Sequence, residues 1–186
     1  MQRKNASSNV PLVRGGVLLK DVRGGFLTRI IDSNEFEAVN YVLRCEDGSL
    51  YCCQLDIAVY ENRNNLLMMA FDYGLPVTLS GDENGNITGL AVARSNAPLP
   101  SLNCGFLKLQ DSRTGMVVRI VDKNQGAAIT YVLQTEDGAR YCVNMWPNQD
   151  TFDNRNVLFM MALRTNMAVT VSGGLHHEVT AIAVGS

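Results

Sequence analysis

Residues 24–53 read GGFLTRIIDSNEFEAVNYVLRCEDGSLYCC, and residues 114–143 read TGMVVRIVDKNQGAAITYVLQTEDGARYCV. The two stretches align without a gap. The match continues farther along the chain, where LPVTLSGDENGNITGLAVAR at 75–94 lies over MAVTVSGGLHHEVTAIAVGS at 167–186. Roughly four in ten aligned positions are identical at a period of about ninety residues, and self-similarity at a fixed period indicates a duplicated unit. The chain therefore carries two repeats of one small domain.

The alignment also predicts domain boundaries. A flexible N-terminal tail is expected at 1–14, the first repeat at 15–94 and the second at 104–186. The stretch SNAPLPSLN at 95–103 separates the repeats, and its polar, proline-bearing composition is typical of a short, stiff linker.

Both repeats show the same order of expected elements. Four short segments rich in apolar and β-branched residues predict strands, and a Glu-Asp-Gly turn joins the third to the fourth. Asp-Gly at 47–48 and 137–138 supplies the positive φ angles that a tight hairpin turn needs. Two further strands end each repeat, PVTLSG and ITGLAVA in the first and AVTVSG and VTAIAVG in the second.

One helix is expected in each repeat, at ENRNNLLMMA (61–70) and DNRNVLFMMA (153–162). Gly74 and Asn166 stand where a left-handed residue would end each helix. Apolar residues recur at the spacing of one helix face, which in the first repeat comprises Leu66, Met69, Ala70 and Tyr73. The candidate N-caps are asparagines: Asn62 or Asn64, and Asn154 or Asn156.

This order of elements, in about eighty residues, predicts a mostly β fold. We expect two tandem OB-fold-like small barrels, each with five or six strands and one short helix before the last hairpin.

The helix and the strands after it resemble a known family. NLLMMAFDYGLPVTLSG with ITGLAVA, VLFMMALRTNMAVTVSG with VTAIAV, and the Tyr-Cys pairs at 51–52 and 141–142 are similar to the B subunits of bacterial AB5 toxins. The nearest are those of subtilase cytotoxin and its pertussis-like relatives. The resemblance implies an OB-fold, a ring or other oligomer built by edge-strand pairing, and binding of surface glycans. It carries over no sugar-contacting residue.

Charge is distributed unevenly along this chain of formal net charge −2. Residues 1–14 hold three basic and no acidic side chains, residues 15–103 six basic and eleven acidic, and residues 104–186 seven of each. A nucleic-acid binder needs a basic face and stacking aromatics. The aromatic candidates have apolar and acidic neighbours, which disfavours nucleic acid: Tyr41, Tyr51, Tyr131 and Tyr141.

Segments that address a protein to a membrane are not apparent. No run of eighteen apolar residues occurs, so we expect no membrane span. No signal peptide is visible either. The localisation is therefore left open: secreted if the toxin-like resemblance holds and a signal peptide was removed, and otherwise cytoplasmic.

The five cysteines are an odd number and form no C-x-x-C motif. We expect buried, reduced thiols, with a Cys45–Cys53 disulfide across a hairpin as the alternative. Their spacing with His176 and His177 does not suit zinc. The sequence gives no reason to expect any other metal or a cofactor.

No catalytic constellation stands out, so we expect a protein that is not an enzyme. His176 and His177 are neighbours in a predicted turn, and we interpret them as exposed turn residues, with a pair between a histidine and Cys142 as the alternative. The Glu-Asp pairs at 46–47 and 136–137 precede glycine and are typical of hairpin turns.

Arginines recur at matching places in the two repeats, at Arg29 with Arg119 and at Arg63 with Arg155. We expect ion pairs within each repeat. The alternative is a contact between repeats or between subunits. The candidate partners are Asp32, Asp122, Glu61 and Asp153.

The repeats differ most before the helix, where CVNMWPNQDTFDN at 142–154 contains an insertion and the only tryptophan. An exposed tryptophan flanked by amide and carboxylate groups suits a sugar, because its ring covers the apolar side and its neighbours bind hydroxyls. The alternative is a Trp146 side chain packed on its own barrel or on the other repeat. The predicted ligand contacts are Trp146, Asn148, Gln149 and Asp150, with Asp56 and Tyr60 as weaker equivalents.

We therefore expect a non-enzymatic binding module, lectin-like or toxin-B-like, that recognises a glycan or a host surface and forms a homo-oligomer. Two alternatives remain. One is a bacterial effector or scaffold that assembles through exposed strand edges of its duplicated barrels and binds protein partners. The other is an OB-type single-stranded nucleic-acid binder.

Overall fold

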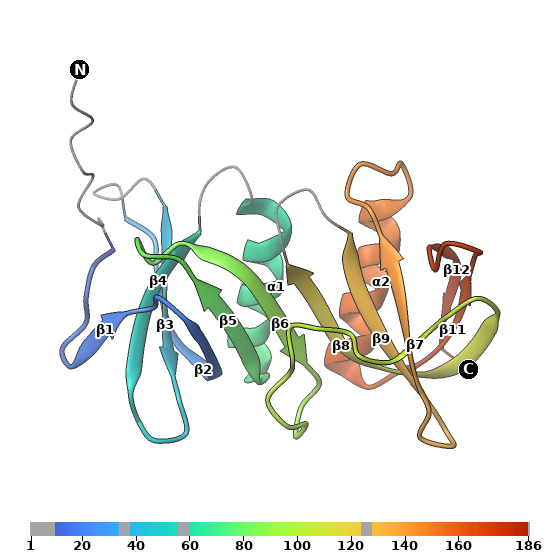
Figure 1. Ribbon diagram of the computed structural model, residues 1–186, viewed down its shortest axis with the longest axis horizontal. Coiled ribbons are helices and arrows are strands. Elements are labelled where there is room, and N and C mark those ends of the chain that lie inside the picture. The colour runs from blue at the N-terminus through green and yellow to red at the C-terminus, as the bar shows by residue number, and fades with distance from the viewer. Residues whose placement is uncertain (1–9, 34–37, 56–59, 124–127, 186) are drawn as a thin grey trace.

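The computed structural model describes residues 10–33, 38–55, 60–123 and 128–185 (Figure 1). These residues form a mostly β structure with twelve strands and two helices. The strands of the first repeat are β1 (Gly16–Leu18), β2 (Val22–Ile31), β3 (Val39–Arg44), β4 (Leu50–Leu55), β5 (Val77–Gly81) and β6 (Ile87–Ala93), with α1 (Tyr60–Tyr73) between β4 and β5. Those of the second are β7 (Leu107–Lys108), β8 (Ser112–Lys123), β9 (Ile129–Thr135), β10 (Arg140–Met145), β11 (Ala168–Gly173) and β12 (Val179–Val184), with α2 (Phe152–Thr165) before β11.

The two repeats have the same element order, as the sequence predicts, and the same strand pairings. In the first, β2 pairs with β3 and β5, β3 with β4 and β5 with β6, all antiparallel, and β1 pairs with β4 in parallel. The second repeats each pairing with β7 to β12. Even the register shift between Leu27 and Arg29 recurs between Val117 and Arg119. The sequence repeat is thus a structural repeat.

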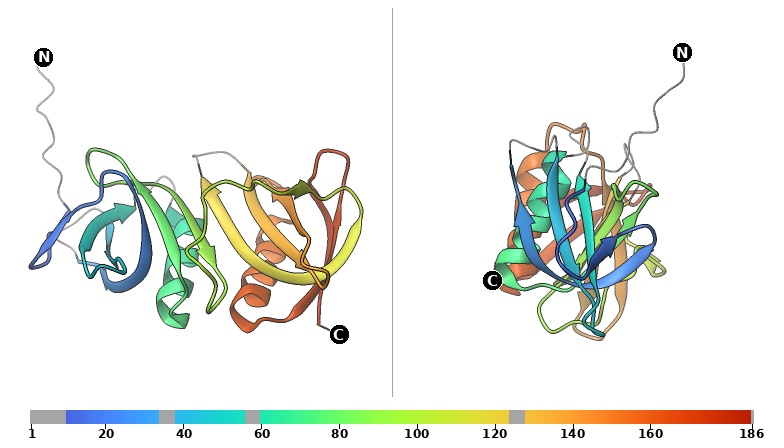
Figure 2. Two further views of the ribbon diagram at one scale, coloured as in Figure 1. Left: turned by 60° about the horizontal axis from the view of Figure 1, so that its bottom comes forward. Right: turned by 90° about the vertical axis from the view of Figure 1, so that its left-hand side faces the viewer.

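The repeats are joined into one mixed sheet rather than separated by the linker. β6 of the first repeat pairs with β8 of the second, so the sheet runs from β1 through β6 and β8 to β7. Both helices lie on the same side of the molecule (Figures 1 and 2). The two repeats are therefore in direct contact through β6 and β8, and the linker is not the only connection between them.

Both expected helices form, but the predicted asparagine caps are wrong. Each helix begins before the asparagines, and the N-cap of α2 is Thr151, whose side chain makes no capping hydrogen bond. Asn64 and Asn156 lie inside the helices, where their side-chain oxygens accept hydrogen bonds from the buried hydroxyls of Tyr41 and Tyr131. These asparagines hold each helix on the third strand of its repeat, which is a tertiary role.

The predicted helix ends and turns are confirmed. Gly74 and Asn166 adopt positive φ angles of 61° and 54° directly after their helices, and a left-handed residue at this position ends a helix. Gly48 and Gly138 do the same in the Asp-Gly hairpin turns, at 84° and 85°. These four residues end the helices and form the hairpin turns at matching places in the two repeats.

The helices cover the core with apolar faces. Leu66, Met69 and Ala70 of α1 are buried as predicted, whereas Tyr73 is 46 % exposed. In α2, Phe159 is buried and stacks on Tyr131 with ring centroids 4.0 Å apart. One cluster of buried apolar side chains runs through both repeats, so they share a continuous core.

The inter-repeat interface contains a buried ion pair. Arg63 of α1 contacts Asp122 of β8 with Nε and Oδ1 3.1 Å apart. Asn62 donates to Oδ2 of the same carboxylate at 2.7 Å. The expectation of an ion pair within each repeat is therefore wrong for Arg63, and the alternative of a contact between repeats is confirmed. Arg155, its counterpart, instead donates to the carbonyl oxygens of Val179 and Thr180.

The cysteines divide into two groups. Cys104 and Cys142 form a disulfide with Cα atoms 6.2 Å apart, which the sequence did not predict. Cys45, Cys52 and Cys53 are free thiols, as expected, and the alternative Cys45–Cys53 disulfide is wrong. The disulfide could not be predicted from the sequence, because Cys104 and Cys142 become neighbours only when the chain that follows the linker packs against β10.

Some of the residues before β1 pack against the first repeat. Of the expected N-terminal tail, residues 1–9 lie outside the described residues. Val10 is buried against Val42 and Cys52. Among the described residues, Val10 and Val13 thus cover the part of β3 and β4 that carries Val42 and Cys52.

Candidate functional site

The predicted tryptophan loop lies between β10 and α2. Trp146 follows β10 directly and is half-buried, while Asn148, Gln149 and Asp150 are exposed. The backbone N–H of Gln149 donates to the Trp146 carbonyl at 3.1 Å and closes a turn. The predicted contacts of the second repeat thus share one loop, in which three of the four side chains reach solvent.

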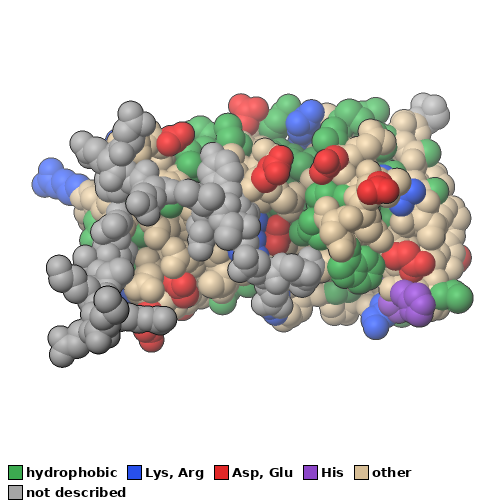
Figure 3. Space-filling model, turned by 90° about the horizontal axis from the view of Figure 1, so that it is seen from above, with side chains coloured by type: hydrophobic (Ala, Val, Ile, Leu, Met, Phe, Trp, Pro, Cys, Tyr) green, Lys and Arg blue, Asp and Glu red, His purple; other side chains and the backbone are tan. Residues whose placement is uncertain are grey.

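The corresponding place in the first repeat is only partly described. Asp56 lies outside the described residues, and Tyr60 opens α1 with a side chain that also lies outside them. Figure 3 looks onto the face that carries the tryptophan loop, where the acidic side chains of the described residues are spread among apolar ones. Such a face does not attract a phosphate backbone.

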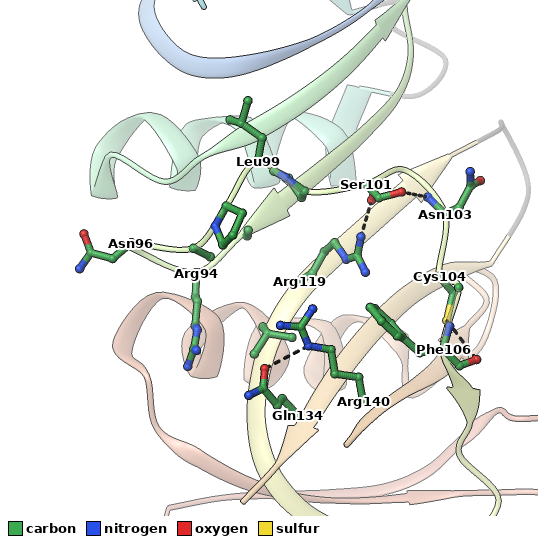
Figure 4. Close-up of a pocket in the computed structure, with 16 residues that line it drawn as sticks. Arg94, Asn96, Leu99, Ser101, Asn103, Cys104, Phe106, Arg119, Gln134 and Arg140 are labelled. Atoms are coloured by element: carbon green, nitrogen blue, oxygen red, sulfur yellow. Dashed lines mark hydrogen bonds between the residues drawn. The ribbon is translucent and has the colours of Figure 1, made fainter. Parts of the chain in front are cut away.

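A pocket of about 490 Å³ opens where the linker crosses β8, and we call it the linker pocket (Figure 4). Its walls come from the end of β6, the linker, the middle of β8 and the ends of β9 and β10 that meet at their hairpin. The side chains that give it chemical character are Arg94, Phe106, Arg119, Gln134 and Arg140.

The linker is fastened along β8. Arg119 donates from Nη1 to the Ser101 carbonyl at 2.9 Å. The Ser101 hydroxyl accepts the Asn103 backbone N–H at 3.1 Å, and Lys123 donates to the Asn103 side chain at 2.8 Å. The expected spacer is therefore a fixed wall, held to the second repeat by arginine and lysine.

Two arginines and one phenylalanine meet at the base of the linker pocket. The Cζ atoms of Arg119 and Arg140 each lie 5.3 Å from the centre of the Phe106 ring. Arg140 also donates from Nε to the Gln134 side-chain oxygen at 3.1 Å, which orients its guanidinium. In Figure 4 the two guanidinium groups lie near each other with the ring beside them. Cation–π contacts of this kind hold a guanidinium in place without neutralising it.

The linker pocket carries uncompensated positive charge. Arg119 is only 7 % exposed, and burial lowers its pKa, with the nearby charge of Arg140 lowering it further. Within the described residues, no carboxylate forms an ion pair with Arg119, and no acidic side chain lines the pocket. Arg94 adds a third cation at the rim. An anion bound here would relieve the repulsion between the guanidinium groups.

The disulfide fixes one wall of the linker pocket. Cys104 lines the pocket and is bonded to Cys142 of β10. Phe106 lies two residues farther along and its backbone N–H donates to the Cys104 sulfur at 3.4 Å. The disulfide thus fixes the chain just before Phe106 to the sheet.

The first repeat does not reproduce this arrangement. Leu50 stands at the position that matches Arg140, and Gly16 stands at the position that matches Phe106. Arg29, which matches Arg119, is exposed. The linker pocket, which the end of β6 helps to form, therefore has no counterpart built on β1 to β4 of the first repeat.

Sequence reasoning missed the linker pocket because it treated residues 95–103 as a spacer. The available signal was the difference between repeats, a leucine in one and Arg140 in the other, and a glycine in one and Phe106 in the other. The ligand site was instead predicted at the tryptophan insertion. That insertion lies at the opposite end of β10, since Arg140 begins the strand and Trp146 follows it.

No catalytic centre emerges from the part of the chain that the structure describes. His176 is exposed and His177 half-buried in the β11–β12 turn, at one end of the face in Figure 3. His177 has a φ of 63°, close to the 77° of Gly85 at the matching place, which suits a turn residue. The alternative of a histidine paired with Cys142 is wrong, because that sulfur is in the disulfide. Over the described residues, no three His, Cys, Asp or Glu side chains gather as a metal site would require.

Comparisons with protein-family models, with curated proteins and with solved structures find no match for this chain. Among the described residues, neither helix has the length and apolar character to cross a membrane. The function must accordingly be argued from the chain's own residues.

Proposed function

We propose that this chain is a non-enzymatic binding protein whose linker pocket recognises an acidic group on a glycan. One observation carries the proposal. Arg119 is a buried cation with no carboxylate partner among the described residues, and it lies beside a second cation, Arg140, and an aromatic ring, Phe106. A guanidinium pair of this kind binds a planar carboxylate or a sulfate by charge-assisted hydrogen bonds.

The rest of the linker pocket suits a sugar that bears such a group. The Phe106 ring offers an apolar surface for the face of a pyranose. The amides of Gln134 and Asn103 are within the lining and provide hydrogen-bonding groups for hydroxyls. A volume of about 490 Å³ falls in the range of small-molecule sites.

The fold that we propose for each repeat is a small OB-type barrel. The closure of such a barrel brings the end of the fourth strand to the start of the last one. Parallel bridges between Gln54 and Asn86, and between Asn144 and Glu178, support this closure in both repeats. Barrels of this kind serve as binding modules for oligosaccharides and oligonucleotides.

The tryptophan loop is the second region that we propose for ligand contact. It lies at the opposite end of β10 from Arg140, so one short ligand cannot fill both regions. An extended glycan that reached from one to the other would have to follow the strand. Trp146→Ala tests this region separately from the linker pocket.

A secreted or cell-surface setting agrees with the proposed function. The Cys104–Cys142 disulfide supports an oxidising compartment, because thiols are kept reduced in the cytosol. The partner would then be a glycan presented on another cell or on a soluble glycoprotein.

A second candidate function is the binding of single-stranded nucleic acid. It is favoured by the same three cations and by Phe106, which offers a base a stacking surface. The acidic side chains of the face in Figure 3 argue against a long track for the phosphate backbone. Glycan recognition therefore remains the preferred proposal.

The decisive experiment is a glycan array that holds carboxylated, sulfated and neutral oligosaccharides, followed by calorimetric titration of the hits. We expect carboxylated or sulfated ligands to bind and neutral ones not to. Arg140→Ala should weaken binding by roughly tenfold to a hundredfold, because a charge-assisted hydrogen bond contributes about 1.5–3 kcal/mol. Arg140 is exposed, so the substitution leaves the core intact.

Arg44→Ala is the matched control, since Arg44 is an exposed arginine on a strand of the first repeat and does not line the linker pocket. It should leave binding unchanged. Glycan binding that is insensitive to Arg140→Ala would show that the linker pocket is not the site. Retention of single-stranded oligonucleotides in place of glycans would favour the second candidate function.

A further inference from the structure

The inter-repeat interface is built on one pair of neighbouring strands. β6 and β8 pair antiparallel, with Gly89 opposite Lys123 at one end and Ala93 opposite Arg119 at the other. Leu90 and Val92 are fully buried on the β6 side. This interface therefore joins the last strand of one repeat to the second strand of the next.

A polar network locks this interface in register. Asp122 accepts hydrogen bonds from Arg63 at 3.1 Å and from Asn62 at 2.7 Å. Asn156 of α2 in turn donates to the Asn62 side-chain oxygen at 3.0 Å. Two residues of the first repeat thus meet two residues of the second.

All four residues of this network have an identical counterpart at the other end of the chain. The second repeat carries Asn154 and Arg155 where the first has Asn62 and Arg63, and the first carries Asp32 and Asn64 where the second has Asp122 and Asn156. Asp32 and Asn154 are exposed. The chain therefore presents the two halves of a second, unassembled network at its opposite ends.

The strand edges that would accompany this network are open. Among the described residues, β12 pairs with β11 alone. Within the part of the chain that the structure describes, β2 pairs with β5 only as far as Gly25, and beyond that residue β3 is its one partner strand. We call residues 181–184 the β12 edge and residues 29–32 the β2 edge. Ile182 and Val184 of the β12 edge are only half-buried, whereas their counterparts Leu90 and Val92 are fully buried.

We propose that the β12 edge of one chain pairs with the β2 edge of a second copy of this chain, in the antiparallel register of the inter-repeat interface. That register sets Ile182 opposite Asp32 and Val184 opposite Ile30. It brings Arg155 of one chain to Asp32 of the next, as Arg63 meets Asp122 within the chain. The contact joins two different surfaces, so it is head-to-tail and leaves a free edge at each end.

Continuity with the internal interface identifies the occupant as a second copy. The same residue types, the same strand pair and the same charge complementarity are present at both ends, and the chain already forms this contact once. Burial of the β12 and β2 edges would also remove two open sheet edges, which are otherwise templates for unspecific pairing.

The test uses one exposed substitution on each edge of the full chain. Asp32→Arg places a cation against Arg155 at the β2 edge, and Ala183→Lys places a charge at the β12 edge where the counterpart Ala91 is fully buried. Sedimentation velocity over a range of concentrations should show the unaltered chain in species larger than a monomer. Each variant should raise the apparent dissociation constant by roughly tenfold or more.

A mixture of the two variants then separates head-to-tail contact from any other. Asp32→Arg keeps an intact β12 edge and Ala183→Lys keeps an intact β2 edge, so the mixture should form a one-to-one dimer and stop there. Lys20→Glu, an exposed charge reversal between β1 and β2, is the control and should leave association unchanged. Circular dichroism confirms that each variant is folded.

Three results would overturn the proposal. The first is an unaltered chain that remains monomeric at all concentrations. The second is association that survives both edge substitutions, which would indicate a different surface or partner. The third is a mixture of folded variants that fails to dimerise. Glycan binding at the linker pocket does not involve either edge, so its outcome is independent of these results.

Discussion

At the scale of single residues, Tyr131 shows how one side chain ties a helix to a sheet. Its ring is fully buried and stacks on Phe159, and its hydroxyl donates to Asn156 at 2.6 Å. Burial raises the pKa of Tyr131, and the Asp122 carboxylate raises it further, so the hydroxyl keeps its proton throughout the neutral range. Asn156 in turn donates to Asn62 across the inter-repeat interface.

Tyr131→Phe should lower the free energy of unfolding by about 1–3 kcal/mol, because it removes the donor and leaves the Asn156 oxygen buried without it. The aromatic stack on Phe159 is kept. Urea unfolding at constant m-value measures the change. Tyr141→Phe, on a half-buried tyrosine of the same repeat, is the control and should stay within about 0.5 kcal/mol. Equal effects of the two substitutions would contradict the role assigned to Asn156.

Residue identity alone predicted some positions and not others. Gly74 and Asn166 were placed correctly, because a left-handed backbone at a helix end restricts the choice of residue. Asn64 and Asn156 were misread as caps, because the same amide that caps a helix can accept a hydrogen bond from a distant tyrosine. Local preference cannot reveal a partner that lies more than twenty residues away.

At the scale of elements, the disulfide decides the position of the linker. Cys104 directly follows the linker and Cys142 lies in β10, at a sequence separation of 38. Closing a loop of that length stabilises the folded state by about 3–4 kcal/mol in the chain-entropy description. The effect should be concentrated in the second repeat, where the loop lies.

Reduction of the disulfide should therefore lower the Tm of the unaltered chain and weaken ligand binding at the linker pocket. The Cys104→Ser/Cys142→Ser variant should begin with the lower Tm and show no further change when reductant is added. Calorimetry with and without reductant measures both. A Tm of the unaltered chain that is unaffected by reductant would contradict a stabilising role for this bond.

Element order was predictable, whereas element contact was not. The repeat, the Asp-Gly turns and the single amphipathic stretch define strands and helices from local sequence alone. The pairing of β6 with β8 has no such local signal. Each repeat has an arginine that matches Arg63 or an aspartate that matches Asp122, so the sequence favoured an ion pair within each repeat over the one between repeats. The linker pocket was missed for the same reason: its residues converge only once the linker crosses β8.

At the scale of the whole molecule, the two repeats depend on one buried ion pair. The side chains of Arg63 and Asp122 are 4 % and 10 % exposed. Removing one member of a buried pair leaves an uncompensated charge and typically costs about 3–5 kcal/mol. Because the core is shared as well, we expect the two repeats to unfold as one cooperative unit.

Asp122→Asn should lower the free energy of unfolding by about 3–5 kcal/mol, because Arg63 stays buried without its carboxylate. Asp32→Asn, the same change at the matching exposed position, should alter it by less than about 0.5 kcal/mol when the chain is monomeric. Scanning calorimetry at low protein concentration compares the two. Similar effects of both substitutions would show that the inter-repeat ion pair does not stabilise the molecule.

The presence of one linker pocket for two repeats, over the described residues, would set the number of ligands that a chain can bind. Leu50 and Gly16 stand in the first repeat where the second has Arg140 and Phe106, so a chain would have two structural units but one copy of the proposed anionic-ligand site. In a head-to-tail row of chains, these sites would recur with every second unit. Simultaneous engagement of a dense ligand surface would then raise the avidity by orders of magnitude without a tighter individual site. A monomeric chain would lose that advantage while each of its sites kept the same intrinsic affinity.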